Sequence, residues 1–188
     1  MSYVLWHSAG MNRTPEEDPQ NDAPGARRVT ELSELEGLVE IGMKRDALRL
    51  ARRLLRKPVL KAKPFNEALN AVLTLAATLK PWKRVVESAY ERLPKRERPA
   101  VRFLMMGFRS GLHDHAGVLC LMPRRFTGDN ALGELAFVFD AALALDTREF
   151  LDRLAKQLPR ACKTAVHPVM EAKLVYSWAE YLARKGEW

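Results

Sequence analysis

Apolar residues recur at every third or fourth position along most of the chain from Thr30 onward. This spacing places them on one face of an α-helix, and no stretch shows the clear alternation of apolar and polar residues that marks a half-buried strand. The pattern predicts an all-α protein with helices over residues 30–42, 44–57, 65–79, 82–93, 98–110, 114–125, 130–144, 147–163 and 168–185. Pro123 and Pro159 fall near the ends of two of these segments and should kink or shorten those helices.

Residues that cap helix N-termini support several of these segments. Ser33 with Glu36, and Asp146 with Glu149, have the spacing of a capping box, in which the two side chains satisfy two free backbone N–H groups. Asp114 is a further N-cap candidate, because a carboxylate accepts a hydrogen bond from the first helical turn.

The first 28 residues differ in composition from the rest of the chain. The polar run EEDPQNDAPG interrupts them with prolines and a glycine, and such a run buries too little apolar surface to offset its ordering entropy. We therefore expect a flexible N-terminal tail over residues 1–28 and a single all-α domain over residues 29–188. Residues 3–6 are an apolar exception, and docking of this tip on a groove of the chain itself or of a partner is the alternative to a disordered end.

Four helical segments share a layout of a turn, a polar entry and apolar residues four positions apart. Their first aligned positions are Ala47, Val85, Ala116 and Phe150, and their second are Ala51, Ala89, Cys120 and Leu154. Successive first positions are 38, 31 and 34 residues apart. Recurrence near 34 residues, with two helices per unit, is typical of a helical solenoid, because one helix pair cannot bury its apolar face alone.

These residues resemble the tetratricopeptide repeat (TPR) family. Gly42 takes the place of the turn glycine, Ala47 and Ala51 the small residues of the second helix, and Trp82 an aromatic after the next turn; Gly111 and Ala116 fit the third unit. The resemblance covers residues 30–163 and implies antiparallel helix hairpins stacked as a short superhelix. Most units lack the family's first-helix tryptophan and small residue, and the units differ in length, so an irregular all-α array is the alternative.

The last predicted helix, over residues 168–185, carries one apolar face. Met170, Leu174, Trp178 and Leu182 recur at four-residue intervals on it. A terminal helix of this kind closes the open end of a repeat stack, and we interpret it as a C-terminal cap. A dimer-forming helix is the alternative.

The charge balance favours anionic partners. Lys and Arg number 31 and Asp and Glu 23, which gives a net charge of +8. This excess suits nucleic acid, an acidic peptide or an anionic membrane surface, although solubility alone would also explain it. No apolar stretch reaches the roughly 20 residues of a membrane span, so membrane insertion is not expected. Cys120 and Cys162 lie in apolar helical patterns and are expected to be buried free thiols, and with no signal-peptide pattern they indicate a cytoplasmic protein.

Motifs for chemistry are missing from the sequence, which predicts neither an enzyme nor a cofactor. There is no glycine-rich phosphate loop, no nucleophile elbow and no zinc-protease motif. His113 and His115 flank Asp114, but ligands on a helix should lie three or four residues apart to share a face. We therefore predict a turn with an Asp cap there, and no metal site.

A stripe of arginines marks the segment 44–57. Arg45, Arg49, Arg52, Arg53 and Arg56 fall within about 100° of one another around a helix, opposite Ala47 and Ala51. Like charges at this spacing repel, so the stripe suggests an anionic partner. The alternative is internal neutralisation by acids of the preceding helix, namely Glu31, Glu34, Glu36 and Glu40.

A second candidate surface follows from the family resemblance, which implies that the first helix of each unit lines a concave groove. Two polar lines on such helices would meet there: Asn70, Thr74 and Thr78 on one, and Arg98, Arg102, Met105 and Arg109 on the next. Amide and guanidinium donors suit a carboxylate. An ordinary solvated helix face is the alternative.

Together these features predict a non-enzymatic protein–protein interaction scaffold, an adaptor or chaperone-like module that holds an acidic or extended peptide in the concave groove. A helical-repeat protein that binds nucleic acid through the stripe at residues 45–56 is the alternative. An enzyme on an all-α scaffold has the least support, because no titratable groups form a recognisable arrangement.

Overall fold

The computed structural model describes residues 30–157 and 168–186, and within these ranges every regular element is helical. The all-α prediction is therefore confirmed. The α-helices are α1 (Glu31–Glu40), α2 (Lys44–Leu55), α3 (Ala62–Leu75), α4 (Lys83–Arg92), α5 (Arg98–Gly111), α6 (His115–Cys120), α7 (Ala131–Ala144), α8 (Arg148–Ala155) and α10 (Pro168–Lys185), and the 3₁₀ helix η1 (Lys80–Trp82) precedes α4. The predicted tail, Pro159 and Cys162 lie outside the described residues.

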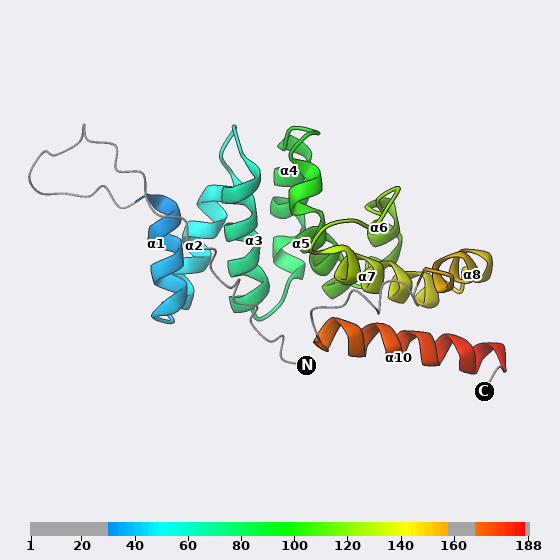
Figure 1. Ribbon diagram of the computed structural model, residues 1–188. Helices are drawn as coiled ribbons and strands as arrows, with labels where there is room; N and C mark the ends of the chain where they lie inside the picture. Colours follow the sequence, from blue (N-terminus) through cyan, green and yellow to red (C-terminus); the bar gives the residue numbers. More distant parts are fainter. Residues whose placement is uncertain (1–29, 158–167, 187–188) are drawn as a thin grey trace, which may run out of the picture.

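Helices α1 to α5 stand side by side, while α7, α8 and α10 run across them at the other end of the molecule (Figure 1). The odd-numbered helices contact one another in chain order, α1 with α3, α3 with α5 and α5 with α7. Helices α2 and α4 make the corresponding contact beside them. Helix hairpins are thus layered against each other, most regularly over α1 to α5.

Small residues allow the hairpins to approach closely. Ala47 and Ala51 of α2 and Ala68 of α3 are all fully buried, and α2 packs against both α1 and α3. Phe65 of α3 and Phe108 of α5 are also fully buried. The aligned alanines Ala47 and Ala51 therefore lie on a buried helix face, as the apolar spacing predicts.

Helix α7 is the centre of the C-terminal half. It is apolar around nearly its whole circumference, and α5, α6, α8 and α10 all contact it. A helix without a polar stripe is stable only when neighbours cover every side. Leu174 and Tyr181 of α10 are buried against this half, so α10 covers α7.

The third repeat unit departs from its prediction. The helix expected over residues 114–125 ends at Cys120, because the residue before Pro123 is pushed out of the helical conformation. Ala116 and Cys120 are exposed, so the expectation that the Cys120 thiol is buried was wrong. Helix α6 contacts α5 and α7, and its Val118 is fully buried. Ala116 and Cys120 lie on the exposed side of this short helix.

The helix caps agree with the sequence only in part. The carboxylate of Asp114 accepts a hydrogen bond of 2.9 Å from the N–H of Gly117, as predicted. The two predicted capping boxes are wrong, because the N-cap of α1 is Thr30, three residues before Ser33, and the N-cap of α8 is Thr147, one residue after Asp146. In the described ranges, no helix is both long and apolar enough to cross a membrane.

Candidate binding surface

The arginines of α5 are occupied within the chain. Arg102 donates two parallel hydrogen bonds of 2.9 Å, from Nε and Nη2, to the two carboxylate oxygens of Glu134 on α7. Glu134 is only 3% exposed, and the Arg102 side chain is 20% exposed. The groove prediction chose Arg102 because its guanidinium can donate two hydrogen bonds to one carboxylate. In the structure these two donors are used by Glu134.

Arg109 is held in the same way. It donates bonds of 2.9 and 2.7 Å to the carboxylate of Glu87 on α4 and a third of 2.7 Å to the carbonyl of Gly117 on α6. The hydrogen bond to Glu87 raises the pKa of the Arg109 guanidinium above its ordinary value and outweighs the effect of burial. Arg109 therefore ties α5 to two neighbouring helices.

The other members of the predicted groove do not converge with these arginines. Arg98 donates to the carbonyls of Leu93 and Glu91, at the end of α4. Met105 is fully buried in the core. Asn70 and Thr74 are exposed on α3, and Thr78 is exposed beyond the end of that helix.

The arginine stripe of α2 has a different environment. Arg45, Arg49, Arg53 and Arg56 are all exposed. Arg49 lies 3.3 Å from the carboxylate of Asp46 one turn earlier, an ion pair open to solvent. Arg52 instead packs its guanidinium 4.7 Å from the ring centre of Trp82. Among the described residues, Arg45 and Arg56 have no ion-pair or hydrogen-bond partner from their side chains.

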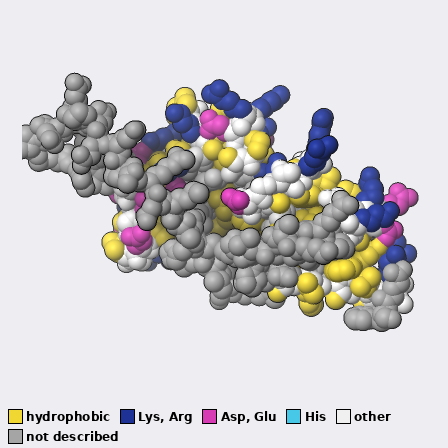
Figure 2. Space-filling view, in the orientation of Figure 1, with side chains coloured by type: hydrophobic (Ala, Val, Ile, Leu, Met, Phe, Trp, Pro, Cys, Tyr) yellow, Lys and Arg dark blue, Asp and Glu magenta, His cyan; other side chains and the backbone are white. Residues whose placement is uncertain are grey.

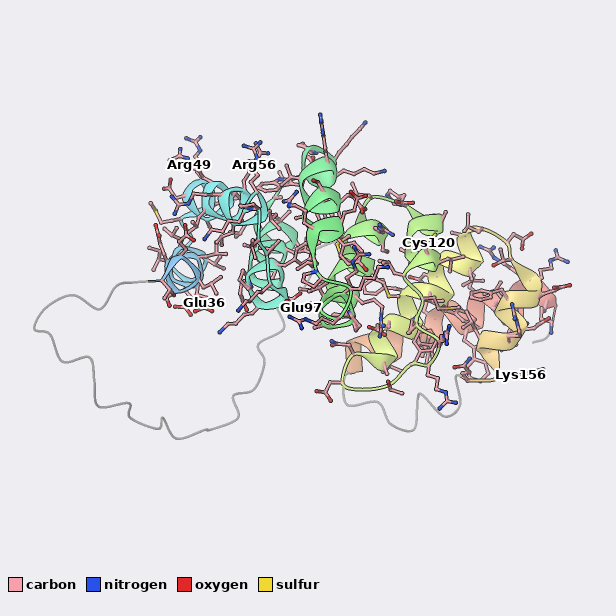
Figure 3. The ribbon with its side chains drawn as sticks, turned by 90° about the horizontal axis from the view of Figure 1, so that it is seen from above. Glu36, Arg49, Arg56, Glu97, Cys120 and Lys156 are labelled. Carbon is pink, nitrogen blue, oxygen red and sulfur yellow. The ribbon has the colours of Figure 1, made fainter. Side chains whose placement is uncertain are left out.

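Internal acids neutralise only a part of this stripe. Glu31 is paired with Arg53, at 3.3 Å, and with Lys57. The hydrogen bond from Lys57, with the charges of Lys57 and Arg53, lowers the pKa of the Glu31 carboxyl below its ordinary value. Glu34, Glu36 and Glu40 are exposed elsewhere on α1, and Figure 3 shows Glu36 on the opposite side of the hairpin from Arg49 and Arg56.

Helix α4 adds two arginines that the sequence analysis missed. Arg84 and Arg92 are exposed on α4, which contacts α2. Arg92 donates a hydrogen bond of 2.5 Å to the Leu55 carbonyl at the end of α2 and one of 2.7 Å to the Ser88 hydroxyl. Arg84, Ser88 and Arg92 lie four residues apart, the same spacing that identified the other polar lines, so this signal was present in the sequence.

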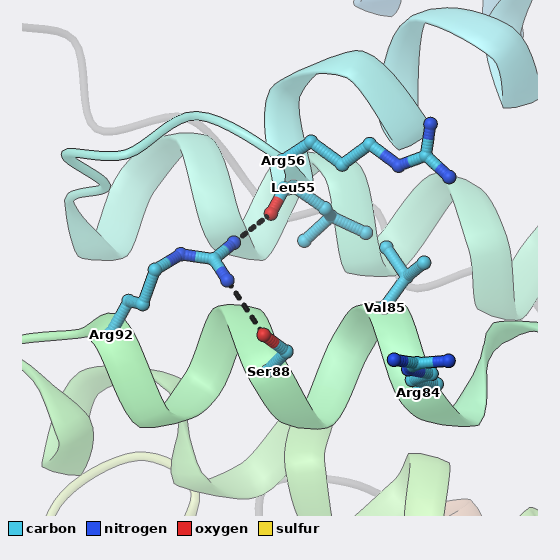
Figure 4. Close-up of a pocket in the computed structure, with 6 residues that line it drawn as sticks. All are labelled: Leu55, Arg56, Arg84, Val85, Ser88 and Arg92. Atoms are coloured by element: carbon cyan, nitrogen blue, oxygen red, sulfur yellow. Dashed lines mark hydrogen bonds between the residues drawn. The ribbon is translucent and has the colours of Figure 1, made fainter.

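Two adjacent cavities lie on this side of the molecule. One, of about 300 Å³, is lined by Leu55, Arg56, Arg84, Val85, Ser88 and Arg92 (Figure 4). The other, of about 450 Å³, is lined by Arg49, Arg52, Arg53, Arg56 and Lys57. Arg56 belongs to both, and among the residues that the structure describes no carboxylate lines either cavity.

We call these basic lining residues of the two cavities the basic face: Arg49, Arg52, Arg53, Arg56, Lys57, Arg84 and Arg92. Figure 3 shows Arg49 and Arg56 projecting on the same side of the molecule. Figure 2 shows further Lys and Arg side chains along the upper edge of the molecule. A surface with this charge, on two rigid helices in contact, attracts anions and offers planar donor forks to carboxylate or phosphate groups.

Other arrangements that could support chemistry are weaker. The rings of His113 and His115 lie 6.2 Å apart, but the carboxylate of Asp114 between them is used as the helix cap. No group of three or more His, Cys, Asp or Glu residues in the described part of the chain is placed to hold a metal ion.

Comparison of the chain with protein-family models, with curated protein sequences and with solved structures finds no match.

Proposed function

We propose that this chain is a non-enzymatic binding protein that holds an acidic segment of another protein on the basic face of α2 and α4. The observation that carries the proposal is the gathering of arginines around two cavities, which no carboxylate of the described residues lines. Arg49, Arg53 and Lys57 of this face already have carboxylate partners, whereas Arg56, Arg84 and Arg92 have none among the described residues. Like charges this close repel one another, and an anionic partner relieves that repulsion.

We also propose that the hairpins form a TPR-like stack. The contacts of α1 with α3, α3 with α5 and α2 with α4 support this arrangement. The basic face then belongs to the second helices of the first two units. The proposed site therefore differs from the first-helix groove that the family resemblance implies, where Arg102 and Arg109 are already paired.

The spacing of the arginines suits an extended acidic chain. Residues four apart on α2, such as Arg52 and Arg56, are about 6 Å apart along the helix axis. Alternate residues of an extended peptide are about 6.6 Å apart and lie on one side of it. A segment with acids at alternate positions can therefore present successive carboxylates to successive guanidinium groups.

Nucleic acid is the second candidate, because phosphates also accept from arginine forks. Binding of single strands usually adds stacking of bases on exposed aromatic rings. Trp82, whose ring packs against Arg52 of the stripe, is 7% exposed. This geometry favours the acidic protein segment.

Fluorescence anisotropy on the full chain tests the proposal. The probes are a labelled peptide with Glu at alternate positions and a single-stranded oligonucleotide of equal charge, each measured over a range of salt. We expect the peptide to bind, with an affinity that falls as salt rises because exposed charges are screened. The double variant Arg49→Glu/Arg56→Glu should lower that affinity by about tenfold or more, equivalent to at least about 1.4 kcal/mol.

Arg124→Glu/Arg125→Glu is the matched control, because both residues are exposed and lie outside the basic face. It changes the net charge equally and should leave most of the affinity intact. Equal losses in the two double variants would show attraction to net charge only. Tighter binding of the oligonucleotide would favour the nucleic-acid function, and absence of peptide binding at low salt would contradict the proposal.

A further inference from the structure

The cavity between the end of α2 and α4 combines two kinds of surface. Three of its six lining residues are arginines, and Leu55 and Val85 are apolar. In Figure 4 the Leu55 and Val85 side chains lie between the guanidinium group of Arg92 on one side and those of Arg56 and Arg84 on the other. Binding by charge alone would not require these apolar residues, so the cavity is also suited to an apolar group of a ligand.

Arg92 is held in place on its side of the cavity. Its Nη2 donates a hydrogen bond of 2.5 Å to the Leu55 carbonyl, and its Nη1 donates one of 2.7 Å to the Ser88 hydroxyl. Both partners are uncharged, so the positive charge of Arg92 is oriented without being neutralised. A guanidinium has five N–H donors, which leaves others for a ligand.

Arg56 and Arg84 form the other side. Both are exposed, and neither pairs with a carboxylate among the described residues. Val85 is half-buried between the two sides, and Leu55, which lines the cavity beside it, is fully buried. The cavity, of about 300 Å³, therefore has cationic sides and an apolar centre.

Resting on the proposed function, we infer that this cavity accepts a large aliphatic side chain of the partner that is flanked on both sides by acidic residues. The aliphatic group would cover Val85, and the flanking carboxylates would accept from Arg92 on one side and from Arg56 and Arg84 on the other. A sugar–phosphate backbone supplies the charges without an aliphatic group between them. This site selects an acid–apolar–acid motif within the acidic segment.

Two labelled peptides of equal length and charge test the inference on the full chain. Both carry alternating Glu, and they differ only at one central position between two acids, which is Leu in one and Ser in the other. Burial of the leucine should make the first peptide bind about tenfold more tightly. Methyl NMR on the complex should show the Val85 methyl signals shifted by the leucine peptide and nearly unmoved by the serine peptide.

The variant Val85→Thr keeps the side-chain shape and adds a hydroxyl to the apolar centre. It should reduce the preference for the leucine peptide over the serine peptide several-fold. Val59→Thr, at an apolar residue that is 81% exposed and outside the cavity, is the control and should leave that preference unchanged. If Val85→Thr loses its helical circular dichroism, the wild-type peptide pair and the NMR shifts decide the question.

The outcomes separate this inference from the proposed function. Equal affinity of the two peptides, with binding still lost in Arg49→Glu/Arg56→Glu, would overturn the motif and leave the acidic-segment function standing. Failure of both peptides to bind at low salt would overturn both. A Val85 signal that moves equally with the two peptides would also contradict the motif.

Discussion

Arginines at helical spacing occur in two regions of this molecule and have opposite environments. On α5, Arg102 and Arg109 each make a bidentate ion pair with a glutamate of another helix, and both side chains are at most one-fifth exposed. On α2 and α4, Arg56 and Arg84 are exposed and face no carboxylate in the described part of the chain. The same residue type therefore holds helices together in one region and leaves charge available in the other.

The difference comes from what the neighbouring helix supplies. Helix α7 places Glu134, and α4 places Glu87, opposite the α5 arginines. Where α4 meets α2 it adds more arginines, and Arg92 there donates to a carbonyl and a hydroxyl, with no carboxylate partner among the described residues. A row of arginines in a sequence thus has no fixed role until the residues opposite it are known.

The largest effect is expected from breaking the more buried pair. Glu134→Ala leaves Arg102 without its partner in a site where Glu134 is 3% exposed. Removal of one member of a buried ion pair costs about 3–5 kcal/mol. Urea denaturation followed by circular dichroism measures the loss.

The double variant Arg102→Met/Glu134→Leu is the control for this pair. It removes both charges and keeps apolar volume, so it should be clearly more stable than Glu134→Ala. If Glu134→Ala lowers the free energy of unfolding by less than about 1 kcal/mol, this pair contributes no more than an ordinary surface ion pair. The arginines of α5 would then not differ in stability from those of the basic face.

A smaller loss is expected on the other α5 pair. Arg109→Ala removes hydrogen bonds to Glu87 and to the Gly117 carbonyl, which join three helices. Hydrogen bonds to charged groups contribute about 1.5–3 kcal/mol, and at about 2–4 °C per kcal/mol for a chain of this size the melting temperature should fall by roughly 3–12 °C. Differential scanning calorimetry measures the shift, and Arg125→Ala, at an exposed residue, should leave the melting temperature nearly unchanged.

On the basic face, removing an arginine should weaken binding and leave the stability of the fold nearly unchanged. Arg56→Ala should change the free energy of unfolding by no more than about 0.5 kcal/mol, because an exposed side chain without a partner contributes little stability. The same variant should weaken binding of the alternating Glu peptide several-fold, measured by anisotropy. A large loss of stability with unchanged affinity would show that Arg56 is structural, like the arginines of α5.

The smallest effect concerns the exposed contact between α1 and the stripe. The hydrogen bond from Lys57 lowers the pKa of Glu31 below its ordinary value of 4.5. A carboxyl with a lowered folded-state pKa stabilises the fold above the unfolded value and loses that contribution as pH falls through the folded value. The difference in stability between wild type and Glu31→Gln should therefore be present at neutral pH and disappear in acid.

Denaturant titrations of the two proteins at neutral pH and below pH 4.5 make this measurement. A difference that persists unchanged in acid would mean that packing, and not the charge of Glu31, accounts for its effect.

Local pattern was sufficient for much of the architecture. The apolar spacing predicted the all-α fold, and the prediction for α10 coincides with the observed helix over residues 168–185. Pro123 predicted the early end of α6, because proline restricts the residue before it. The burial of Cys120 was wrongly predicted, since four-residue spacing shows which residues share a face and does not show which neighbour covers that face.

The sequence by itself determined the helices, the excess of positive charge and the rows of arginines, because these depend on composition and on spacings of a few residues. Only the tertiary structure decided which arginines are neutralised. Glu87 and Glu134 lie 22 and 32 residues away from their partners along the chain, and helix packing alone brings them together. It also brought α4 beside α2, which made one basic face from two helices that the sequence analysis had treated separately.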